Sequence, residues 1–278
     1  MIRQKSFSND QPTLYLVATP IGNLEDMTFR AVKILKSVDI IYCEDTRVSS
    51  KLLHHFEISK PLKTYHDFNK EFKSANILTH LSNNENVALI SDAGYPLISD
   101  PGYFVIREAI NEGYNVVSIP GANALLTGLV VSGIAPHPFT FIGFLDHKEG
   151  KRKKQLTELI NHKETLVFYE SPHRIGKTVT NMYEVFGERK LVIARELTKR
   201  YEEILRGTTE SLKDIVDLKG EMVIIVEGKL EEDYNPTISI LEEVNSLIEE
   251  GLSSKDAIKE VSKKRGIPKN DVYQEYHN

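Results

Sequence analysis

The chain of 278 residues contains a single cysteine, Cys43, and no tryptophan. One cysteine excludes an internal disulfide and a zinc site built on several cysteine ligands. The most apolar stretch, residues 124–135, is too short to span a bilayer and is interrupted by threonine, serine and glycine. The first dozen residues lack the apolar segment of a signal peptide. We therefore expect a cytoplasmic protein without a membrane segment.

Several motifs of common enzyme classes are also missing. The chain has no Gly-x-x-x-x-Gly-Lys-Ser/Thr loop, no Gly-x-Gly-x-x-Gly after its first strand and no Gly-x-Ser-x-Gly. Their absence leaves a phosphate-cradling NTPase unsupported and weakens the readings of a dinucleotide enzyme and a serine hydrolase. The nine histidines show no pair at the spacing of helical metal ligands beyond the adjacent His54 and His55. We expect no metal site.

The chain also lacks an excess of positive charge. Its net charge of −5 argues against binding nucleic acid by bulk attraction. Two local basic segments remain, residues 148–154 (KEGKRKK) and residues 255–269. For either one alone a solvated surface is the better explanation, although a local basic face for nucleic acid is not excluded.

The composition that is present is typical of a soluble globular protein, with 40% hydrophobic and 27% charged residues. Strands and helices alternate over residues 13–132, which predicts a mostly parallel sheet. A segment rich in proline and glycine, residues 133–139, predicts a domain link. Beyond it we expect a second α/β layer with more strands per helix, a mixed sheet, and one helix carrying Leu212, Ile215 and Val216.

The centre of the first half is residues 87–102, VALISDAGYPLISDPG. The run from Val87 to Ile90 predicts a buried strand, and Asp100 with Pro101 predicts the start of a helix. Ligands of open α/β sheets bind beyond the carboxyl ends of such strands. Asp92 therefore has two readings: it accepts hydrogen bonds from a ligand, or it caps a turn.

Two neighbouring loops have a similar character. Residues 44–47 (Glu-Asp-Thr-Arg) follow a strand candidate at 39–43, and residues 120–124 (Pro-Gly-Ala-Asn-Ala) follow one at 116–119. The first is either part of a site or the start of a helix, where acidic residues favour the positive end of the dipole. The second opens an apolar helix that Gly133 is suited to end.

The last part of the chain differs from the rest. Ser253 is suited to cap a helix over residues 254–265, Gly266 breaks it, and another helix starts near Pro268. Two short helices joined through glycine resemble a helix-turn-helix, and lysines crowd this module. Such a module contacts nucleic acid or a dimer partner. The sequence thus predicts a tail at 1–12, α/β domains at 13–133 and 134–230, and a helical extension at 231–278.

Six segments together resemble the tetrapyrrole-methylase superfamily, and within it the 16S ribosomal RNA (cytidine-2′-O)-methyltransferase branch. They run in order over residues 13–228 and read LYLVATPIGNLEDMT, YCEDTRVSSKLL, LISDAGYPLISDPG, IPGANALL, FYESPHRI and ARELTKRYEEILRGT. The resemblance implies the two-domain fold of class III S-adenosylmethionine methyltransferases, a homodimer, and a helix-turn-helix-like extension. The implied reaction is 2′-O-methylation of cytidine 1402 in 16S ribosomal RNA, in the decoding centre of the small ribosomal subunit.

The resemblance also implies where S-adenosylmethionine binds. The expected cofactor residues are Pro20, Ile21, Asp92, Ala93, Gly94, Tyr95, Ala122, Asn123, Tyr169, Leu197 and Met222. The sequence has Ser-Asp-Ala at residues 91–93 where small-molecule members more often read Gly-Asp-Pro. This departure fits the RNA branch and leaves the contacts of Ala93 open.

Roles in catalysis and RNA binding follow from charge and loop position. A carboxylate, or a lysine of lowered pKa, would help to remove the proton of a ribose 2′-hydroxyl, so the candidates are Asp45 first, Glu44 second, and Lys199. Candidates for RNA contact are Arg47, Arg174, Arg195, Lys255, Lys263 and Lys264. Arg195 beside Glu196 has an equal reading as a structural ion pair. Two other functions compete: C-methylation of a tetrapyrrole, and a ligand-sensing domain coupled to a DNA-binding tail.

Overall fold

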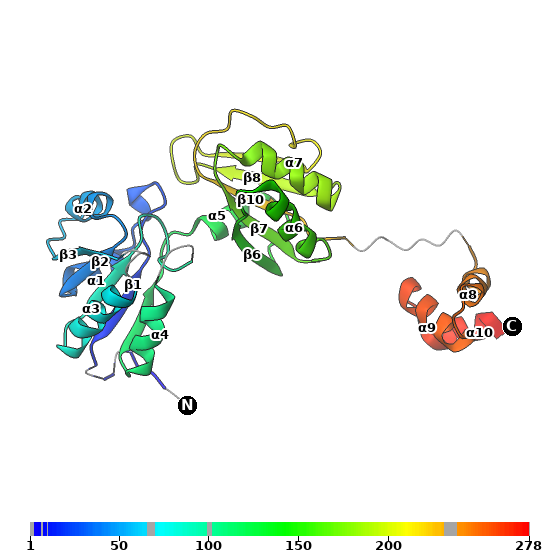
Figure 1. Cartoon of the computed structure of the whole chain (residues 1–278), viewed down its shortest axis with the longest axis horizontal. Helices are drawn as coiled ribbons and strands as arrows, with labels where there is room; N and C mark the ends of the chain where they lie inside the picture. The colour runs from blue at the N-terminus through cyan, green and yellow to red at the C-terminus, as the bar shows by residue number, and fades with distance from the viewer. Residues whose placement is uncertain are drawn as a thin grey trace. The chain divides into compact units, whose positions relative to one another are not determined.

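The computed structural model describes residues 3–6, 8–9, 11–65, 70–98, 102–230 and 238–277. It divides into two compact units, Met1–Lys229 and Leu230–Asn278. Within the described residues the first unit holds two five-stranded sheets and the second holds three helices (Figure 1). No helix in these residues is both long and apolar enough to cross a bilayer.

The first sheet is parallel throughout, in the order β3-β2-β4-β1-β5. A helix joins each pair of consecutive strands, because parallel neighbours need a crossover connection. The loops after β2, β4, β1 and β5 therefore emerge next to one another at one edge. The elements are β1 (Thr13–Val17), η1 (Leu24–Asp26), α1 (Phe29–Ser37), β2 (Ile40–Cys43), α2 (Thr46–His55), β3 (Leu62–Thr64), α3 (Lys70–Ser82), β4 (Val87–Ile90), α4 (Tyr103–Asn111) and β5 (Asn115–Ile119).

Alternating side chains of this sheet pack against helices on both faces. Val17 and Ile90 belong to a core with α1 and α2, whereas Leu14 and Leu89 belong to a core with α3 and α4. Burial of each such side chain contributes about 1.5–3 kcal/mol. The predicted parallel sheet is confirmed.

The second sheet is mixed, in the order β6-β7-β10-β8-β9. β6 pairs parallel with β7, and all other pairs are antiparallel, as the denser strand pattern predicted. Helices α6 and α7 cover one face through a core that includes Phe168 and Ile224. The elements are β6 (Phe139–Phe144), α6 (Glu149–Leu159), β7 (Thr165–Glu170), α7 (Ile175–Phe186), β8 (Lys190–Arg195), β9 (Glu203–Thr208) and β10 (Met222–Val226).

Helix α5 (Ala124–Ser132) connects the two sheets. It follows β5 of the first sheet, but Leu125 and Leu129 pack on the second sheet. A β-carbon at Gly128 would lie 3.2 Å from the Val223 side chain, so glycine allows close approach to β10. Gly133 ends the helix in the left-handed conformation, as predicted. The two sheets are thereby held together within one unit.

The second unit is a three-helix module formed by α8 (Ile240–Glu249), α9 (Ser254–Arg265) and α10 (Lys269–His277). Ser253 caps α9 by accepting a hydrogen bond from Asp256, and Gly266 ends it at φ +63°, both as predicted. Its small core includes Val244, Val261 and Val272.

Three predictions from the sequence are not confirmed by the structure. Asp100 and Pro101 lie outside the described residues, and α4 begins at Tyr103 with Gly102 as its N-cap. The helix predicted around Leu212 is absent, because backbone oxygens of this segment are engaged with α7: Lys213 O accepts a hydrogen bond from Thr180 Oγ1 at 2.6 Å. The domain boundaries at 12/13 and 133/134 stay predictions.

Candidate active site

Loops from four strands of the first sheet meet at a cavity of about 350 Å³, a volume within the range of small-molecule sites. The ends of β6, β7, β8 and β10 close its other side. The first sheet contributes Ile21, Glu44, Asp92, Ala93, Gly94, Tyr95, Ile98, Asn123 and Ala124. The second contributes Phe144, Tyr169, Glu170, Ser171, Pro172, Ala194, Leu197, Lys199, Glu221, Met222 and Val223.

The loops after β1, β4 and β5 are linked by hydrogen bonds. Thr19 and Gly94 exchange backbone hydrogen bonds of 2.9 and 3.1 Å, and Thr19 Oγ1 donates to Ser91 O at 3.1 Å. The Gly121 amide donates to Tyr95 Oη at 3.3 Å. Gly94 has φ +76°, a conformation that glycine adopts without strain. The floor of the cavity is therefore fixed before any ligand enters.

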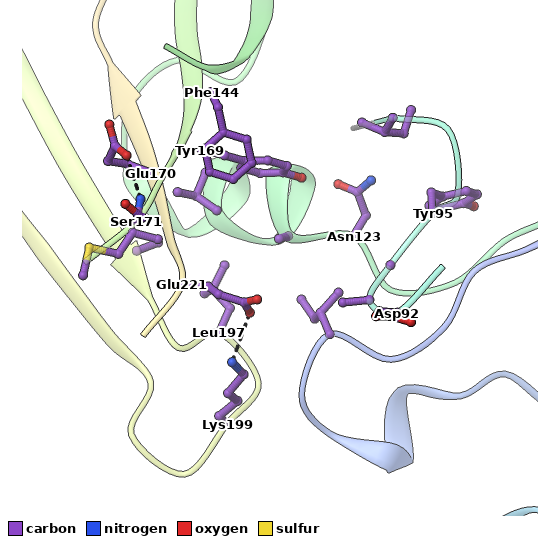
Figure 2. Close-up of a pocket in the computed structure, with 18 of the residues that line it drawn as sticks. Asp92, Tyr95, Asn123, Phe144, Tyr169, Glu170, Ser171, Leu197, Lys199 and Glu221 are labelled. Atoms are coloured by element: carbon purple, nitrogen blue, oxygen red, sulfur yellow. Dashed lines mark hydrogen bonds and ion pairs between the residues drawn. The ribbon is translucent and has the colours of Figure 1, made fainter. Parts of the chain in front are cut away.

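Asp92 connects this floor to the loop after β2. Its Oδ1 accepts a hydrogen bond of 3.2 Å from the Asp45 amide, and its side chain lines the cavity (Figure 2). The Asp45 carboxylate does not line the cavity, because it caps α2 and pairs with Arg47, with Nη2 to Oδ2 at 2.6 Å. The structure thus shows a helix start at Asp45, while the preceding Glu44 lines the cavity.

The opposite wall is apolar and partly aromatic. Tyr169 lies edge-on to Phe141 and to Phe144, with ring centroids 4.9 and 5.6 Å apart. Leu197 and Met222 continue this wall from the second sheet. Figure 2 shows Tyr169 and Phe144 on one side of the cavity, across from the loops of the first sheet. Such a wall suits a planar heterocycle.

The turn after β8 has an unusual backbone. Glu196 and Thr198 have φ of +50° and +68°, and they flank Leu197. Non-glycine residues rarely adopt this conformation, which costs of the order of 1–2 kcal/mol per residue. The strain presents Leu197 to the cavity, where it is a lining residue.

Lys199 crosses from the second sheet to the loop after β1. Its ammonium donates to Glu196 Oε1 at 2.9 Å. It also donates to Glu221 Oε2 at 3.1 Å, the contact that Figure 2 shows. A β-carbon at Gly22 would overlap the aliphatic part of Lys199. Glycine at position 22 therefore lets the lysine pass over the loop and close this end of the cavity.

The electrostatics of Lys199 bear on its predicted role as a base. Burial lowers the pKa of the ammonium, but hydrogen bonds to Glu196 and Glu221 outweigh this cost and the pKa is raised. The pKa of Glu196 is lowered, chiefly by its hydrogen bond from Lys199. An amine with a raised pKa holds its proton at neutral pH, so this geometry disfavours Lys199 as a general base.

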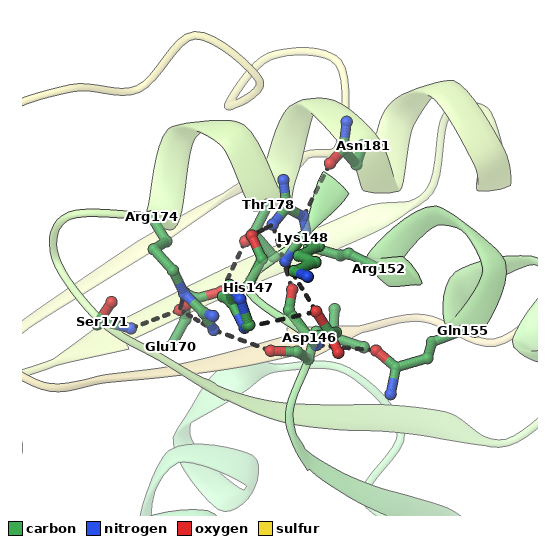
Figure 3. A network of polar contacts seen from close by, with 11 residues as sticks. Asp146, His147, Lys148, Arg152, Gln155, Glu170, Ser171, Arg174, Thr178 and Asn181 are labelled. Carbon is green, nitrogen blue, oxygen red and sulfur yellow. Dashed lines mark hydrogen bonds and ion pairs between the residues drawn. The ribbon is translucent and has the colours of Figure 1, made fainter. Parts of the chain in front are cut away.

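A buried carboxylate, that of the lining residue Glu170, stabilises this side of the cavity. The Glu170 side chain is 1% exposed and accepts hydrogen bonds from the Ser171 amide at 2.7 Å and from Thr178 Oγ1 at 2.6 Å. It pairs with Arg174 at 2.8 Å, and Arg174 Nη2 also donates to Leu145 O at 3.1 Å (Figure 3). The Glu170–Arg174 ion pair therefore links the ends of β6 and β7.

Arg152 extends this network to the next loop. It is buried, and its Nε donates to Asn181 Oδ1 at 2.8 Å. Its Nη1 donates to the backbone oxygens of Asp146 and His147 at 3.3 and 3.2 Å (Figure 3). Arg152 thus fixes the course of the chain after Phe144.

The structure brings most of the predicted cofactor residues to the cavity. Pro20 and Ala122 flank lining residues without lining it themselves, and Asn123 also caps α5 through a hydrogen bond of 2.9 Å from Leu126. Arg174 and Arg195 hold ion pairs with Glu170 and Glu203, so neither presents a free guanidinium. Arg47 is 87% exposed in its pair with Asp45, and Lys255, Lys263 and Lys264 are exposed on α9 of the second unit.

Sequence reasoning missed several lining residues. The quoted segment FYESPHRI held a signal for three of them, Glu170, Ser171 and Pro172, which directly follow Tyr169. Phe144 had no such signal, because its orientation depends on a strand irregularity. The others are Ile98, Ala124, Ala194, Glu221 and Val223.

Curated relatives match the chain over nearly its whole length. A protein named ribosomal RNA small subunit methyltransferase I from Bacillus subtilis (strain 168) is 46% identical, with 99% of this chain and 98% of the relative covered. The protein of the same name from Halalkalibacterium halodurans is 47% identical, covering 100% and 99%.

The fold has relatives among solved structures as well. The uroporphyrin-III C-methyltransferase from Thermus thermophilus, solved in complex with S-adenosylhomocysteine, superposes with a TM-score of 0.54 at 19% identity, covering 77% of this chain and 96% of that one. A family model described as tetrapyrrole (corrin/porphyrin) methylases matches residues 13–213. The chain therefore belongs to the tetrapyrrole methylase family, in the group of ribosomal RNA small subunit methyltransferase I proteins.

Proposed function

We propose that this methyltransferase transfers the methyl group of S-adenosylmethionine to the ribose 2′-hydroxyl of cytidine 1402 in 16S ribosomal RNA. The observation that carries the proposal is similarity of 46–47% over nearly the full chain to proteins named for ribosomal RNA small-subunit methylation. An enzyme of this kind works on ribosomal subunits in the cytoplasm. The proposed site is the cavity between the two sheets.

The residues of the cavity fit S-adenosylmethionine. Tyr169, Leu197 and Met222 form an apolar wall for adenine, and the Asp92 carboxylate is suited to accept hydrogen bonds from ribose hydroxyls or an amine. When bound, the sulfonium supplies an already activated methyl group. The chain's own task is then mainly to align the acceptor oxygen for in-line attack and to receive its proton.

For the proton, the structure favours Glu44 over Asp45. Glu44 lines the cavity, whereas Asp45 is engaged with Arg47 and the start of α2. For RNA contact it favours Arg47 and the exposed lysines of α9 over Arg174 and Arg195. We therefore propose Glu44 as the general base, and Arg47, Lys255, Lys263 and Lys264 as phosphate contacts.

The direct experiment uses small ribosomal subunits from cells that lack the gene, with isotopically labelled S-adenosylmethionine. Mass mapping of the RNA should find one new methyl group on a cytidine ribose in the decoding centre.

Reversing the three lysine charges of α9 should raise the KM for subunits. Transfer to a porphyrinogen but not to subunits would instead establish the tetrapyrrole function.

Substitution of Lys199 with arginine tests whether this residue acts through its positive charge or as the general base. The raised pKa of Lys199 gives stability below the unfolded value of about 10.4, lost as pH rises through the folded value. The lowered pKa of Glu196 gives stability above about 4.3, lost as pH falls through its folded value. The pair is therefore intact from about pH 5 to pH 10.

Because arginine keeps the charge but cannot act as a base, we expect Lys199→Arg to retain kcat within roughly tenfold, with an unchanged pH–rate profile. Loss of a general base would instead cost roughly 10²–10⁴-fold. A loss of that size, together with loss of an ionisation from the profile, would show that Lys199 is the base.

We also propose that the protein is a homodimer that uses the outer face of α5. Leu125 and Leu129 point into the core, but Leu126 and Val130, four residues apart, are 50% and 70% exposed. Exposed apolar side chains at this spacing form one stripe that needs a partner. We expect Val130→Glu to halve the mass measured by sedimentation equilibrium. An unchanged dimer mass would exclude this face, and a monomeric wild type would exclude the dimer.

A further inference from the structure

The end of β6 contains a bulge that redirects one aromatic side chain. In its pairing with β7, Phe141 lies opposite Val167, Gly143 opposite Phe168 and Phe144 opposite Tyr169, with a register shift between Phe141 and Gly143. Side chains three apart on a regular strand point to opposite faces. The extra residue puts Phe141 and Phe144 on the same face, the one that holds Val167 and Tyr169.

Gly143 makes this bulge possible. Its φ of +77° lies in the region that favours glycine. Without the bulge, Phe144 would point with Phe168 toward the core under α6 and α7. The bulge therefore removes a phenylalanine from a place where it would be buried and turns it into the cavity.

Phe144 has an open ring surface at this position. It is 56% exposed although it lines the cavity, because β6 is an edge strand of the second sheet. Its ring lies edge-on to Tyr169, across the cavity from Asn123 and Tyr95 (Figure 2). The chain that follows is fixed by the hydrogen bonds of Arg174 to Leu145 O and of Arg152 to the next turn. Phe144 is therefore an exposed ring on a rigid support.

A basic segment begins at Lys148, four residues beyond Phe144. Lys148 is the N-cap of α6, Lys151 and Lys154 lie in its first two turns, and all three are exposed within the basic run KEGKRKK. Aromatic rings flanked by positive charge are how proteins hold single-stranded RNA, with bases stacked on the rings and phosphates beside the lysines. A ribose inside a cavity also requires its nucleotide to leave the base stack.

We propose that Phe144 is the platform on which the base of the acceptor cytidine stacks, with Lys148 and Lys154 holding the adjoining phosphates. This rests on the proposed function, because it takes RNA as the acceptor. Tyr169 and the deeper wall are left for the adenine of the cofactor. Phe144 is thereby a residue that positions the acceptor nucleotide.

The test compares Phe144→Ala, Phe144→Leu and Phe144→Tyr in the full chain. Three quantities are measured: affinity for unmethylated small subunits, affinity for S-adenosylhomocysteine by calorimetry, and kcat/KM for methyl transfer. We expect Phe144→Ala and Phe144→Leu to lower subunit affinity and kcat/KM roughly ten- to hundredfold while cofactor affinity is kept. Phe144→Tyr should restore both, because it retains the ring.

Phe139→Ala is the matched control, because Phe139 lies on the same strand, is also exposed and does not line the cavity. It should leave all three quantities unchanged. Replacing Lys148 and Lys154 with alanine should weaken subunit binding and reduce its salt dependence by a slope of about 1.4, from about 0.7 per phosphate contact.

Three results would overturn the proposal: loss of cofactor affinity in Phe144→Ala with subunit affinity unchanged, full activity in Phe144→Leu, or an equal loss in Phe139→Ala. Binding and transfer are measured separately. Absence of transfer by the wild type would contradict the proposed function, whereas weaker subunit binding by Phe144→Ala would still support the platform.

Discussion

Substitution of Asp92 with alanine is expected to lower cofactor affinity by roughly 10²–10⁴-fold, the equivalent of two charge-assisted hydrogen bonds at about 1.5–3 kcal/mol each. Asp92 is a carboxylate that lines the cavity from the first sheet, in the turn after β4. Calorimetry with S-adenosylhomocysteine measures the affinity, and far-UV circular dichroism checks that the fold is kept.

Asp92→Asn separates charge from structure. The asparagine retains an oxygen for the Asp45 amide, so the turn stays in place and the loss should be smaller, roughly tenfold. Asp39→Asn is the matched control, because Asp39 also accepts a backbone hydrogen bond, at 2.7 Å from Asn86, but precedes β2 at the opposite edge of the sheet. Unchanged affinity in Asp92→Ala would remove this residue from the site.

Replacement of Glu170 with alanine is expected to destabilise the protein by about 3–5 kcal/mol. The substitution leaves the partly buried Arg174 without its carboxylate and removes the hydrogen bonds from the Ser171 amide and Thr178 Oγ1. Urea unfolding followed by circular dichroism measures the change. Glu170→Gln should fall between alanine and the wild type, since the amide keeps an acceptor oxygen.

Glu203→Gln is the comparison for Glu170. It removes a carboxylate from the ion pair with Arg195, but Glu203 is 48% exposed, so we expect less than about 1 kcal/mol. If Glu170→Gln and Glu203→Gln lower the free energy of unfolding equally, the network in Figure 3 does not support the cavity wall.

Much of the first sheet was predictable because parallel strands carry a strong local signal. Short apolar runs such as the one ending at Ile90 are bounded by turn residues, and the topology then brings their loops to one edge. The position of Asp92 at the cavity was predictable because this residue follows such a strand. The roles of Ser253 and Gly266 as helix caps were equally predictable, since capping depends on one or two neighbouring residues.

The remainder depended on contacts between distant residues. Arg174 was predicted from the sequence to contact RNA, but it pairs with Glu170 in the fold. For Arg195 the alternative of a structural ion pair was open, and the fold supplies Glu203 as the partner instead of the adjacent Glu196. The helix expected around Leu212 is replaced by a loop that docks on Gly176 and Thr180 of α7. The orientation of Phe144 toward the cavity was not predictable, because it depends on the β6 bulge and the alternation of side chains alone assigns Phe144 to the other face of the sheet.

A crystal structure of the protein with S-adenosylhomocysteine would decide whether the cavity is the cofactor site. We expect the ligand between the two sheets, with its adenine against Tyr169 and Leu197 and its hydroxyl or amine groups within hydrogen-bond distance of Asp92. A ligand bound at any other place, or one in this cavity that leaves Asp92 without contact, would contradict it.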